Sequence, residues 1–534
     1  MKKTAIIISL TLAYAVCANA QSAYEAMLLS ENNYEGTART VAMGNAFTAL
    51  GGDLGAVTIN PAGSAIAKYS QFSITPSLTM SSTTSHGVSP YPDGNLPYFQ
   101  NRMKSSMTRF SVPNFGISFN WNTNRKNGLK NMAFGFIVNT TNSWNEDIYA
   151  TGDNHTTTFM GALAAGAQAE GLESSWLYST AYESGMIYPF GNAFVGASEQ
   201  IYERLDGKYE IALGGPIDQI MGCRKTGSRQ EYLFNVGANF SDFVYIGANI
   251  GISSTNYIYS EYFKEHAQNP EDFPNEFADQ EGNTYLTHFQ SMKYQYNYEM
   301  SSAGFFAKIG IIVMPATGLR IGAAFQTPVM HSINETWRYS GQTTFTDAEF
   351  NASASSNYGE SSYTFTSPLR ANFGASYTFG KYAVVSADYE FCDYSQMRFG
   401  TDNSYREYFE GENADMKARF TTSHMLRCGV EGKPIECMAI RAGYDFATSP
   451  EVVDGYGHRL PMSFSHNVSA GLGFSSKGSF FTDVAVKRAF YQSEDMMPYQ
   501  DYILGEDDKV LTPAPLINIR KSLWRVLLTV GWRF

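Results

Sequence analysis

Apolar and polar residues alternate along much of this chain, and the clearest case is its last eleven residues. Counting back in twos from Phe534 gives an apolar set bounded by aromatic residues, with Trp524 at its start. The positions between them include Arg525, Thr529 and Arg533. A period of two is that of a β-strand, whose side chains point alternately to its two faces. An apolar face with aromatic residues at both limits, opposite a polar face, is typical of the wall of an outer-membrane barrel.

Alternating stretches of this kind recur from about residue 70 onward. We count 14: Ser70–Ser82, Phe110–Trp121, Met132–Thr141, Tyr232–Phe240, Val244–Ser254, Lys293–Met314, Leu319–Ile333, Tyr363–Phe379, Tyr382–Phe391, Met425–Gly432, Glu436–Phe446, Ser463–Ser475, Ser479–Ala489 and Ser522–Phe534. Short and long connections alternate between them, as periplasmic turns and extracellular loops do in bacterial barrels. The sequence therefore predicts an all-β fold, a 14-stranded antiparallel transmembrane β-barrel over residues 70–534.

The amino terminus has the features of a secretory signal peptide. Lys2 and Lys3 precede an apolar run, Ala5–Val16, and an Ala18-Asn19-Ala20 cleavage site. We expect residues 1–20 to be removed after Ala20, and Cys17 leaves a lipoprotein leader as the alternative. Phe534 resembles the aromatic carboxy-terminal residue of substrates of the barrel-assembly machinery, which makes that machinery an expected partner. These features predict the outer membrane of a Gram-negative bacterium, with its lipid as the surrounding partner.

Composition excludes several other classes of function. The formal net charge of −12 argues against a nucleic-acid partner. The cysteines after the leader, Cys223, Cys392, Cys428 and Cys437, have no metal-binding spacing, so we expect free thiols, no metal and no cofactor. His466 shares the lipid-facing parity of its strand and is the one candidate for an exposed catalytic histidine, but no nucleophile motif accompanies it. We therefore expect no enzyme.

Several predicted inner faces are charged. One strand places Ser386, Asp388 and Glu390 inside, and the strand two positions later places Arg441 and Asp445 inside. These charges either pair across the lumen and stiffen it or line a path for a ligand or an ion.

Residues 21–69 show no strand pattern and precede the first predicted strand. Small residues over Gly36–Leu50 predict a helix, which Gly51-Gly52 would end. Ile59-Asn60-Pro61-Ala62-Gly63 follows, with an extended or turn conformation expected before the proline. A barrel of 14 strands is wide enough to hold a plug or to leave a channel, so we interpret residues 21–69 as a hatch in the lumen.

This segment resembles the amino-terminal hatch of the FadL family, whose plug carries an asparagine-proline-alanine element. That family transports long-chain fatty acids and aromatic hydrocarbons across the outer membrane through a 14-stranded barrel. The resemblance implies that a hydrophobic ligand is caught between loops, moves to an apolar pocket and leaves sideways or past the hatch. Only Asn60, Pro61 and Ala62 can be carried over by motif. The longest loop here lies earlier in the chain than the prominent helical loop of the fatty acid transporters.

Three further features bear on transport. Phe159, Leu163 and Trp176 lie in the longest loop with partly helical spacing, which indicates either a greasy surface groove for the ligand or a self-packed loop cap. Pro113, Pro328 and Pro368 fall within strand patterns, where each marks a rim, a bulge or a gap in the wall; we name Pro113 as the candidate gap. We interpret Tyr294, Tyr296 and Tyr298 as girdle residues at the membrane interface.

Together these features predict diffusive uptake of a hydrophobic small molecule, such as a long-chain fatty acid or an aromatic hydrocarbon. The alternative is a barrel without transport, used for adhesion or as a secretion or assembly scaffold.

Overall fold

A computed structural model describes residues 23–89, 94–203, 209–278, 283–400, 409–453, 464–476, 479–499 and 514–534. The predicted signal peptide, with its cleavage after Ala20, lies outside the described residues.

The strands form one closed wall. In chain order they are β1 (Gln71–Val88), β2 (Met103–Asn122), β3 (Leu129–Asn154), β8 (Ile217–Phe240), β9 (Val244–Ala267), β11 (Thr284–Ala316), β12 (Leu319–Gln326) continued by β13 (Met330–Phe345), β15 (Gly359–Thr366) continued by β16 (Arg370–Phe379), β17 (Ala383–Asp393) continued by β18 (Arg398–Gly400), β19 (Thr422–Ile435), β20 (Met438–Thr448), β21 (Phe464–Ser475), β22 (Phe480–Phe490) and β24 (Leu516–Arg533). Neighbours pair antiparallel, and β1 pairs with β24 from Gln71↔Arg533 to Val88↔Leu516. The predicted closed barrel of 14 strands is confirmed.

The remaining elements lie in the lumen or in the loops. The lumen holds α2 (Ala23–Ser30), α3 (Ala38–Ala42), η1 (Gly55–Thr58) and η2 (Pro61–Ile66). The loops hold α4 (Phe159–Glu170), η3 (Leu172–Ser174), α5 (Trp176–Glu183), β4 (Ile187–Phe190), β5 (Ala193–Gly196), β6 (Glu199–Glu203), β7 (Tyr209–Leu213), η4 (Pro270–Asp272), β10 (Pro274–Ala278), η5 (Ala348–Phe350), β14 (Ala352–Ser355), η6 (Tyr394–Gln396), α6 (Glu410–Arg419) and β23 (Glu494–Met496). No helix among the described residues is long and apolar enough to cross a membrane.

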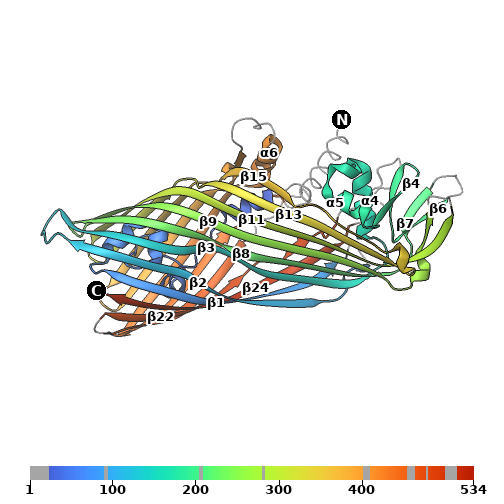
Figure 1. Cartoon of the computed structure of the whole chain (residues 1–534). Coiled ribbons are helices and arrows are strands. Elements are labelled where there is room, and N and C mark those ends of the chain that lie inside the picture. Colours follow the sequence, from blue (N-terminus) through green and yellow to red (C-terminus); the bar gives the residue numbers. More distant parts are fainter. Residues whose placement is uncertain are drawn as a thin grey trace.

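The two ends of the barrel differ in their connections (Figure 1). The carboxy terminus and the short turns β2–β3 and β8–β9 lie at one end of the barrel, which we call the turn end. At the other end, the loop end, lie α4, α5 and the small hairpins β4–β5 and β6–β7. The alternation of short and long connections predicted from the sequence is present.

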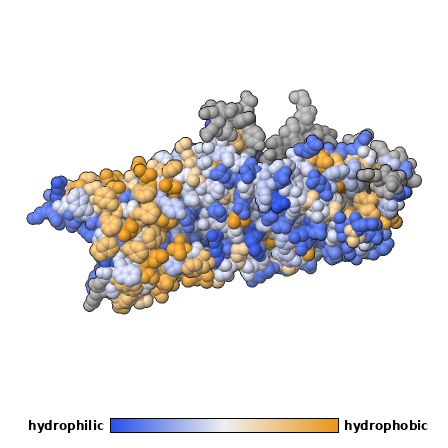
Figure 2. Space-filling view, in the orientation of Figure 1, coloured by the Kyte–Doolittle hydropathy of each residue, from blue (hydrophilic) through white to orange (hydrophobic). Residues whose placement is uncertain are grey.

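On the face that Figure 2 shows, an apolar band crosses the barrel toward the turn end, whereas the surface toward the loop end is largely polar. Exposed apolar residues such as Phe134, Phe373 and Leu528 recur on strands around the wall, so the band surrounds the barrel. On β11 the outward residues Phe305, Ile309 and Ile311 are exposed in the band, but the outward residues Lys293 and Glu299, nearer the loop end, are exposed and charged. β11 has 33 residues, whereas a tilted strand crosses a bilayer in about 9–11 residues. Much of the barrel therefore stands beyond the membrane.

The segment before β1 fills the lumen at the level of the apolar band. Helix α3 covers only Ala38–Ala42, so the prediction of a helix over Gly36–Leu50 is wrong for most of its length. Gly44 and Asn45 have φ values of 61° and 58°. Two consecutive residues in the left-handed region cannot continue an α-helix, so the chain turns there.

A candidate ligand path through the barrel lumen

Asn60 connects the hatch to the wall. Its Oδ1 accepts a hydrogen bond from Ala62 N at 3.0 Å and so caps η2. Its Nδ2 donates to Thr48 O at 2.6 Å within the hatch. The same nitrogen lies 3.2 Å from Ile311 O and 3.3 Å from Ala323 O, which belong to the paired strands β11 and β12. One buried amide thus holds two hatch segments and two wall strands together.

The hatch lies directly against the wall at glycines. A Cβ on Gly310 would lie 1.9 Å from Asn60 Oδ1, and a Cβ on Gly247 would lie 2.4 Å from the carbonyl carbon of Pro61. Such distances leave no space for any side chain, so glycine is required at both positions. The same close approach recurs around the barrel, where a Cβ would come within 3.0 Å of the hatch at Gly237, Gly322, Gly374, Gly429, Gly443 and Gly471.

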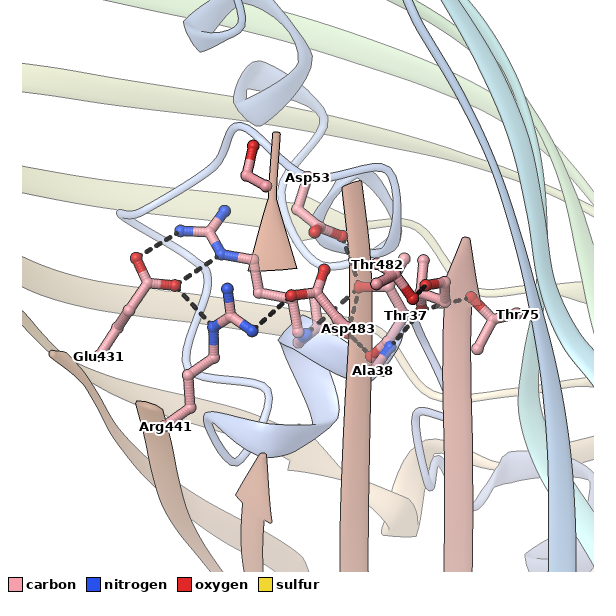
Figure 3. Close-up of polar contacts among 12 residues, drawn as sticks. Thr37, Ala38, Asp53, Thr75, Glu431, Arg441, Thr482 and Asp483 are labelled. Carbon is pink, nitrogen blue, oxygen red and sulfur yellow. Dashed lines mark hydrogen bonds and ion pairs between the residues drawn. The ribbon is translucent and has the colours of Figure 1, made fainter. Parts of the chain in front are cut away.

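Ion pairs secure the other side of the hatch (Figure 3). Arg39 of α3 lies 2.9 Å from Glu431 of β19. Arg441 of β20 bridges Glu431 at 2.7 Å and Asp483 of β22 at 2.6 Å. At the start of α3, Ala38 N donates to Thr529 Oγ1 of β24 at 2.7 Å. Because one end of the network belongs to the hatch and the other to three strands, its bonds resist displacement of the hatch.

Further buried charges are also paired. Glu390 lies 2.7 Å from Arg370 and 3.1 Å from Arg427. Lys487 lies 3.4 Å from Asp445. The sequence placed Ser386, Asp388, Glu390, Arg441 and Asp445 inside, and all of them are buried. At the level of the band the lumen is therefore filled by the hatch and by paired charges. Of the two alternatives for the inward charges, this is pairing that stiffens the lumen, and not the lining of a path for a ligand or an ion.

Beyond the band, toward the loop end, the lumen is aromatic. We call the following set the aromatic column: Phe159, Tyr294, Tyr339, Tyr296, Tyr298 and Tyr257. The ring centroids of successive members are 5.0, 6.4, 4.8, 6.4 and 6.3 Å apart. These separations are those of interacting aromatic pairs. The column therefore runs without interruption from the cap of the barrel down to the start of the hatch, where Tyr257 and Tyr298 pack in one cluster with Leu28 and Leu29 of α2.

The interpretation of Tyr294, Tyr296 and Tyr298 as girdle residues is wrong. Tyr294 and Tyr298 are buried, and their outward neighbours on β11 are Lys293, Gln295, Asn297 and Glu299. This part of β11 is surrounded by water rather than by lipid, so the usual alternation of a soluble sheet applies, with apolar side chains inside and polar side chains outside.

One carboxyl group lies beside the column. Glu335 of β13 accepts hydrogen bonds from the hydroxyl groups of Tyr298, at 2.7 Å, and of Tyr363. The part of β13 from Ser332 onward lies beyond the band, since its outward residues there include Ser332 and Asn334. Burial raises the pKa of Glu335 to about 7. The hydrogen bonds from the two hydroxyl groups lower this pKa, but their effect is smaller than that of burial. Burial among the rings therefore favours the uncharged form of this carboxyl.

The three loop residues predicted as a surface groove occupy two different environments. Phe159 and Leu163 of α4 are buried, and the Phe159 ring stacks on Phe263 at 4.8 Å, at the mouth of the lumen. Trp176, the first residue of α5, is 42% exposed and lies outside the buried cluster that contains the other two. The structure thus brings Phe159 and Leu163 together as a lid on the column, and their role in ligand binding stays a prediction.

Pro113 lies where pairing between β2 and β3 begins. That pairing runs from Asn114↔Asn139 to Asn122↔Asn131 toward the turn end. From Met103 to Ser111, β2 pairs with β1, and in the described part of the chain no ladder joins this stretch to β3. Polar side chains bridge the two strands instead: Arg109 donates to Trp144 O at 3.3 Å and Asn145 to Met107 O at 3.3 Å. Whether this interruption serves release stays a prediction.

No protein-family model matches the chain. No curated protein matches its sequence. Among solved structures, a Pseudomonas aeruginosa FadL homologue is similar with a TM-score of 0.50 at 12% identity, over 95% of this chain and 99% of that one. The toluene transporter TodX of P. putida is similar with a TM-score of 0.50 at 11% identity, over 94% of this chain and 99% of that one.

This chain has the FadL fold. The FadL resemblance first drawn from Asn60-Pro61-Ala62 and the strand count is thereby supported at the level of the fold. A closed FadL-type barrel with an external apolar band is an outer-membrane barrel. Among the described residues no group of three or more histidine, cysteine, aspartate or glutamate side chains could hold a metal ion.

The aromatic column is the part of the site that reading the sequence missed. A signal for it was present, because the outward parity of β11 changes from Asn297 and Glu299 to Phe305 and Ile309 within a few residues. Such a change marks the level at which the strand leaves the membrane.

Proposed function

We propose that this protein carries a hydrophobic small molecule across the outer membrane by diffusion, with the aromatic column as the path through the part of the lumen beyond the membrane. The observation that carries the proposal is the unbroken series of rings from Phe159 to Tyr257 inside a closed barrel. Aromatic side chains offer a large apolar surface to a ligand and need two torsion angles to move aside. Long-chain fatty acids and aromatic hydrocarbons are the two ligand classes that such a surface fits.

The order of events follows from the position of each part. The short turns lie on the periplasmic side and the loops outside the cell, so the ligand enters beneath α4, next to Phe159 and Leu163. It passes along the column as the rings rotate, with the Glu335 carboxyl and the tyrosine hydroxyl groups as hydrogen-bonding groups for a polar headgroup. At the level of the band the ligand meets the hatch. Asn60, Pro61 and Ala62 hold the hatch against β9, β11 and β12. Release follows movement of the hatch or passage beside Pro113.

The fold of the two solved structures supports this proposal, and one of them is named a toluene transporter. The test is uptake of radiolabelled hexadecanoic acid and of a labelled monoaromatic hydrocarbon by a strain that lacks this protein, with and without the protein restored. Restored uptake of one class supports the proposal and selects the ligand class. Equal uptake of both compounds in the two strains contradicts it and favours an adhesin or a scaffold.

A further inference from the structure

One carboxyl group in the aromatic part of the lumen has an oxygen atom without a partner. Glu335 of β13 is 1% exposed. Its Oε1 accepts two hydrogen bonds, from the hydroxyl group of Tyr298 at 2.7 Å and from that of Tyr363. Its Oε2 is buried and accepts no hydrogen bond from any residue that the structure describes. Because a buried oxygen that stays unpaired costs free energy, this one points to a bound group outside the chain itself.

No cation of the protein compensates this carboxyl group. In the described part of the chain no lysine, arginine or histidine forms an ion pair with Glu335, and only the two tyrosine hydroxyl groups stabilise its charge. Lys225 of β8 lies in the same part of the lumen, near Tyr257. Its Nζ, however, donates to the hydroxyl group of Tyr24 at 2.9 Å and lies 5.0 Å from the centre of that ring. The negative charge of Glu335 is therefore available to a cation that enters the lumen.

A second carboxyl group adds to the negative potential at this place. Glu25 of α2 is buried. Burial, and then the charges of Glu25 and Glu335, raise the pKa of Tyr298 well above its usual value. The same three causes, in the same order, raise the pKa of Tyr363. A charge that acts on both tyrosines also acts on a headgroup bound beside them. The site therefore disfavours an anionic headgroup and favours a cationic one.

Aromatic rings lie around the carboxyl group. The centroid of the Tyr363 ring lies 5.5 Å from that of Phe399, and the centroid of the Tyr298 ring lies 6.3 Å from that of Tyr257. Over these four rings the described residues place no lysine or arginine. The face of an aromatic ring attracts a cation, and proteins use sets of such rings to bind ammonium groups. The rings and the Glu335 carboxylate together form a site suited to an ammonium group.

The hydrocarbon part of a ligand meets adaptable side chains at the same place. Met300 of β11 pairs with Glu335 across the two strands, and its side chain is buried. Met397 and Met416 belong to the same buried cluster as Met300. Methionine side chains are unbranched and flexible, so they repack around groups of different shape. An alkyl or aryl chain attached to the ammonium group can therefore be accommodated next to Glu335.

We propose that Glu335 binds the ammonium group of a hydrophobic amine, whose N–H donates to Oε2 while the rings of Tyr298 and Tyr363 lie beside the charge. The proposal rests on the proposed function and names a ligand class for it, the protonated alkylamines and arylalkylamines. An ammonium group that leaves water needs both a hydrogen-bond acceptor and an opposite charge, and Glu335 supplies both. The bound cation in turn favours the ionised carboxylate, which burial alone disfavours. A buried water could fill Oε2 by a hydrogen bond, but it would not supply the charge.

The test compares decylamine, 1-decanol and decanoate, which share one hydrocarbon chain and differ in the headgroup. Their dissociation constants are measured by calorimetry at pH 8 with the protein, purified from outer membranes, in nanodiscs, and the signal of empty nanodiscs is subtracted. We expect the wild type to bind decylamine on the order of 10-fold tighter than 1-decanol, and decanoate more weakly than either. Glu335→Gln keeps an oxygen for the two tyrosine hydroxyl groups but removes the charge. It should weaken decylamine on the order of 10- to 100-fold, leave 1-decanol unchanged and strengthen decanoate.

Glu299→Gln is the matched control, because Glu299 lies on the outer face of β11 next to Met300, the strand partner of Glu335. It should leave all three constants unchanged. Misfolding would weaken all ligands together, so opposite shifts of decylamine and decanoate in Glu335→Gln report the charge.

Two results would overturn the amine site in favour of a bound water: equal binding of decylamine and 1-decanol by the wild type, or unchanged constants in Glu335→Gln. The proposed function then still stands if the protein restores uptake of a labelled monoaromatic hydrocarbon. Uptake of labelled decylamine that is equal with and without the protein also overturns the proposal. If uptake of the hydrocarbon is equal as well, the proposed function fails with it.

Discussion

Replacing Asn60 by alanine tests how the hatch is held in place. The change removes the cap of η2, which costs about 1 kcal/mol. It also removes the donor to Thr48 O, and a buried carbonyl left without a partner costs about 1–3 kcal/mol. Together the losses are on the order of 2–4 kcal/mol for the free energy that keeps the hatch closed. At about 1.4 kcal/mol per tenfold, this corresponds to a roughly 30- to 700-fold larger open population.

Hydrogen exchange followed by mass spectrometry measures this population directly. We expect exchange in peptides that cover Gly55–Ile66 to accelerate by that factor in Asn60→Ala, while exchange in β11 and β24 stays as in the wild type. Asn60→Ser is the matched variant, because serine keeps the capping oxygen but is too short to reach Ile311 O and Ala323 O. Its acceleration should fall between those of the wild type and the alanine variant. Unchanged exchange over Gly55–Ile66 in Asn60→Ala would refute the assignment of Asn60 as an anchor.

Three further outcomes are expected. Gly310→Ala places a methyl group 1.9 Å from Asn60 Oδ1 and should accelerate hydrogen exchange in the same hatch segment. Gly432→Ala should leave this exchange unchanged, because nothing lies within 4 Å of the new carbon. Equal effects of the two changes would refute the close contact. Phe534→Ala should reduce the fraction of heat-modifiable, assembled barrel in cells more than Phe379→Ala does. Both side chains are exposed in the band, but only Phe534 ends the chain. Equal losses would leave no role for recognition of Phe534 by the assembly machinery. The mass of the purified protein should equal that of a chain that begins at Gln21. The mass of an acylated chain that begins at Cys17 would contradict cleavage after Ala20.

The membrane part of the fold was readable from the sequence because lipid imposes a strict rule on the outer face. On β24, Trp524, Leu528 and Trp532 are exposed, and Arg525 and Thr529 are buried, as the alternation predicted. The number of strands followed from the same rule together with the alternation of turns and loops. Each strand there needs only its own residues to be recognised, so no knowledge of its neighbours is required.

The part of the barrel beyond the membrane was misread for the same reason. On β11 the rule inverts between Glu299 and Phe305, because water replaces lipid outside. A tyrosine fits either an interface or an interior, so Tyr294, Tyr296 and Tyr298 alone could not show which applied. Their outward neighbours do show it once the length of the strand is known.

Two features depend on which strands lie side by side, and single-strand patterns do not contain that information. Pro328 and Pro368 were recognised as interruptions, but their position directly opposite each other depends on strand register. Gly310 and Gly247 appear in the sequence as ordinary strand glycines, and only the hatch lying against them explains their lack of a side chain. The helix expected over Gly36–Leu50 failed because Asn45 adopts a left-handed conformation that small-residue composition does not reveal.

The measurement that tests the central claim most directly is uptake of the hydrophobic probe by paired variants of one strand. Tyr296 lies within the aromatic column, and Asn297, the next residue, is exposed on the outer face of β11. We predict that Tyr296→Ala changes the initial rate of uptake while Asn297→Ala leaves it at the wild-type value, with equal amounts of folded barrel in the membrane. Uptake that depends on the protein but is the same in both variants and the wild type would contradict passage along the aromatic column.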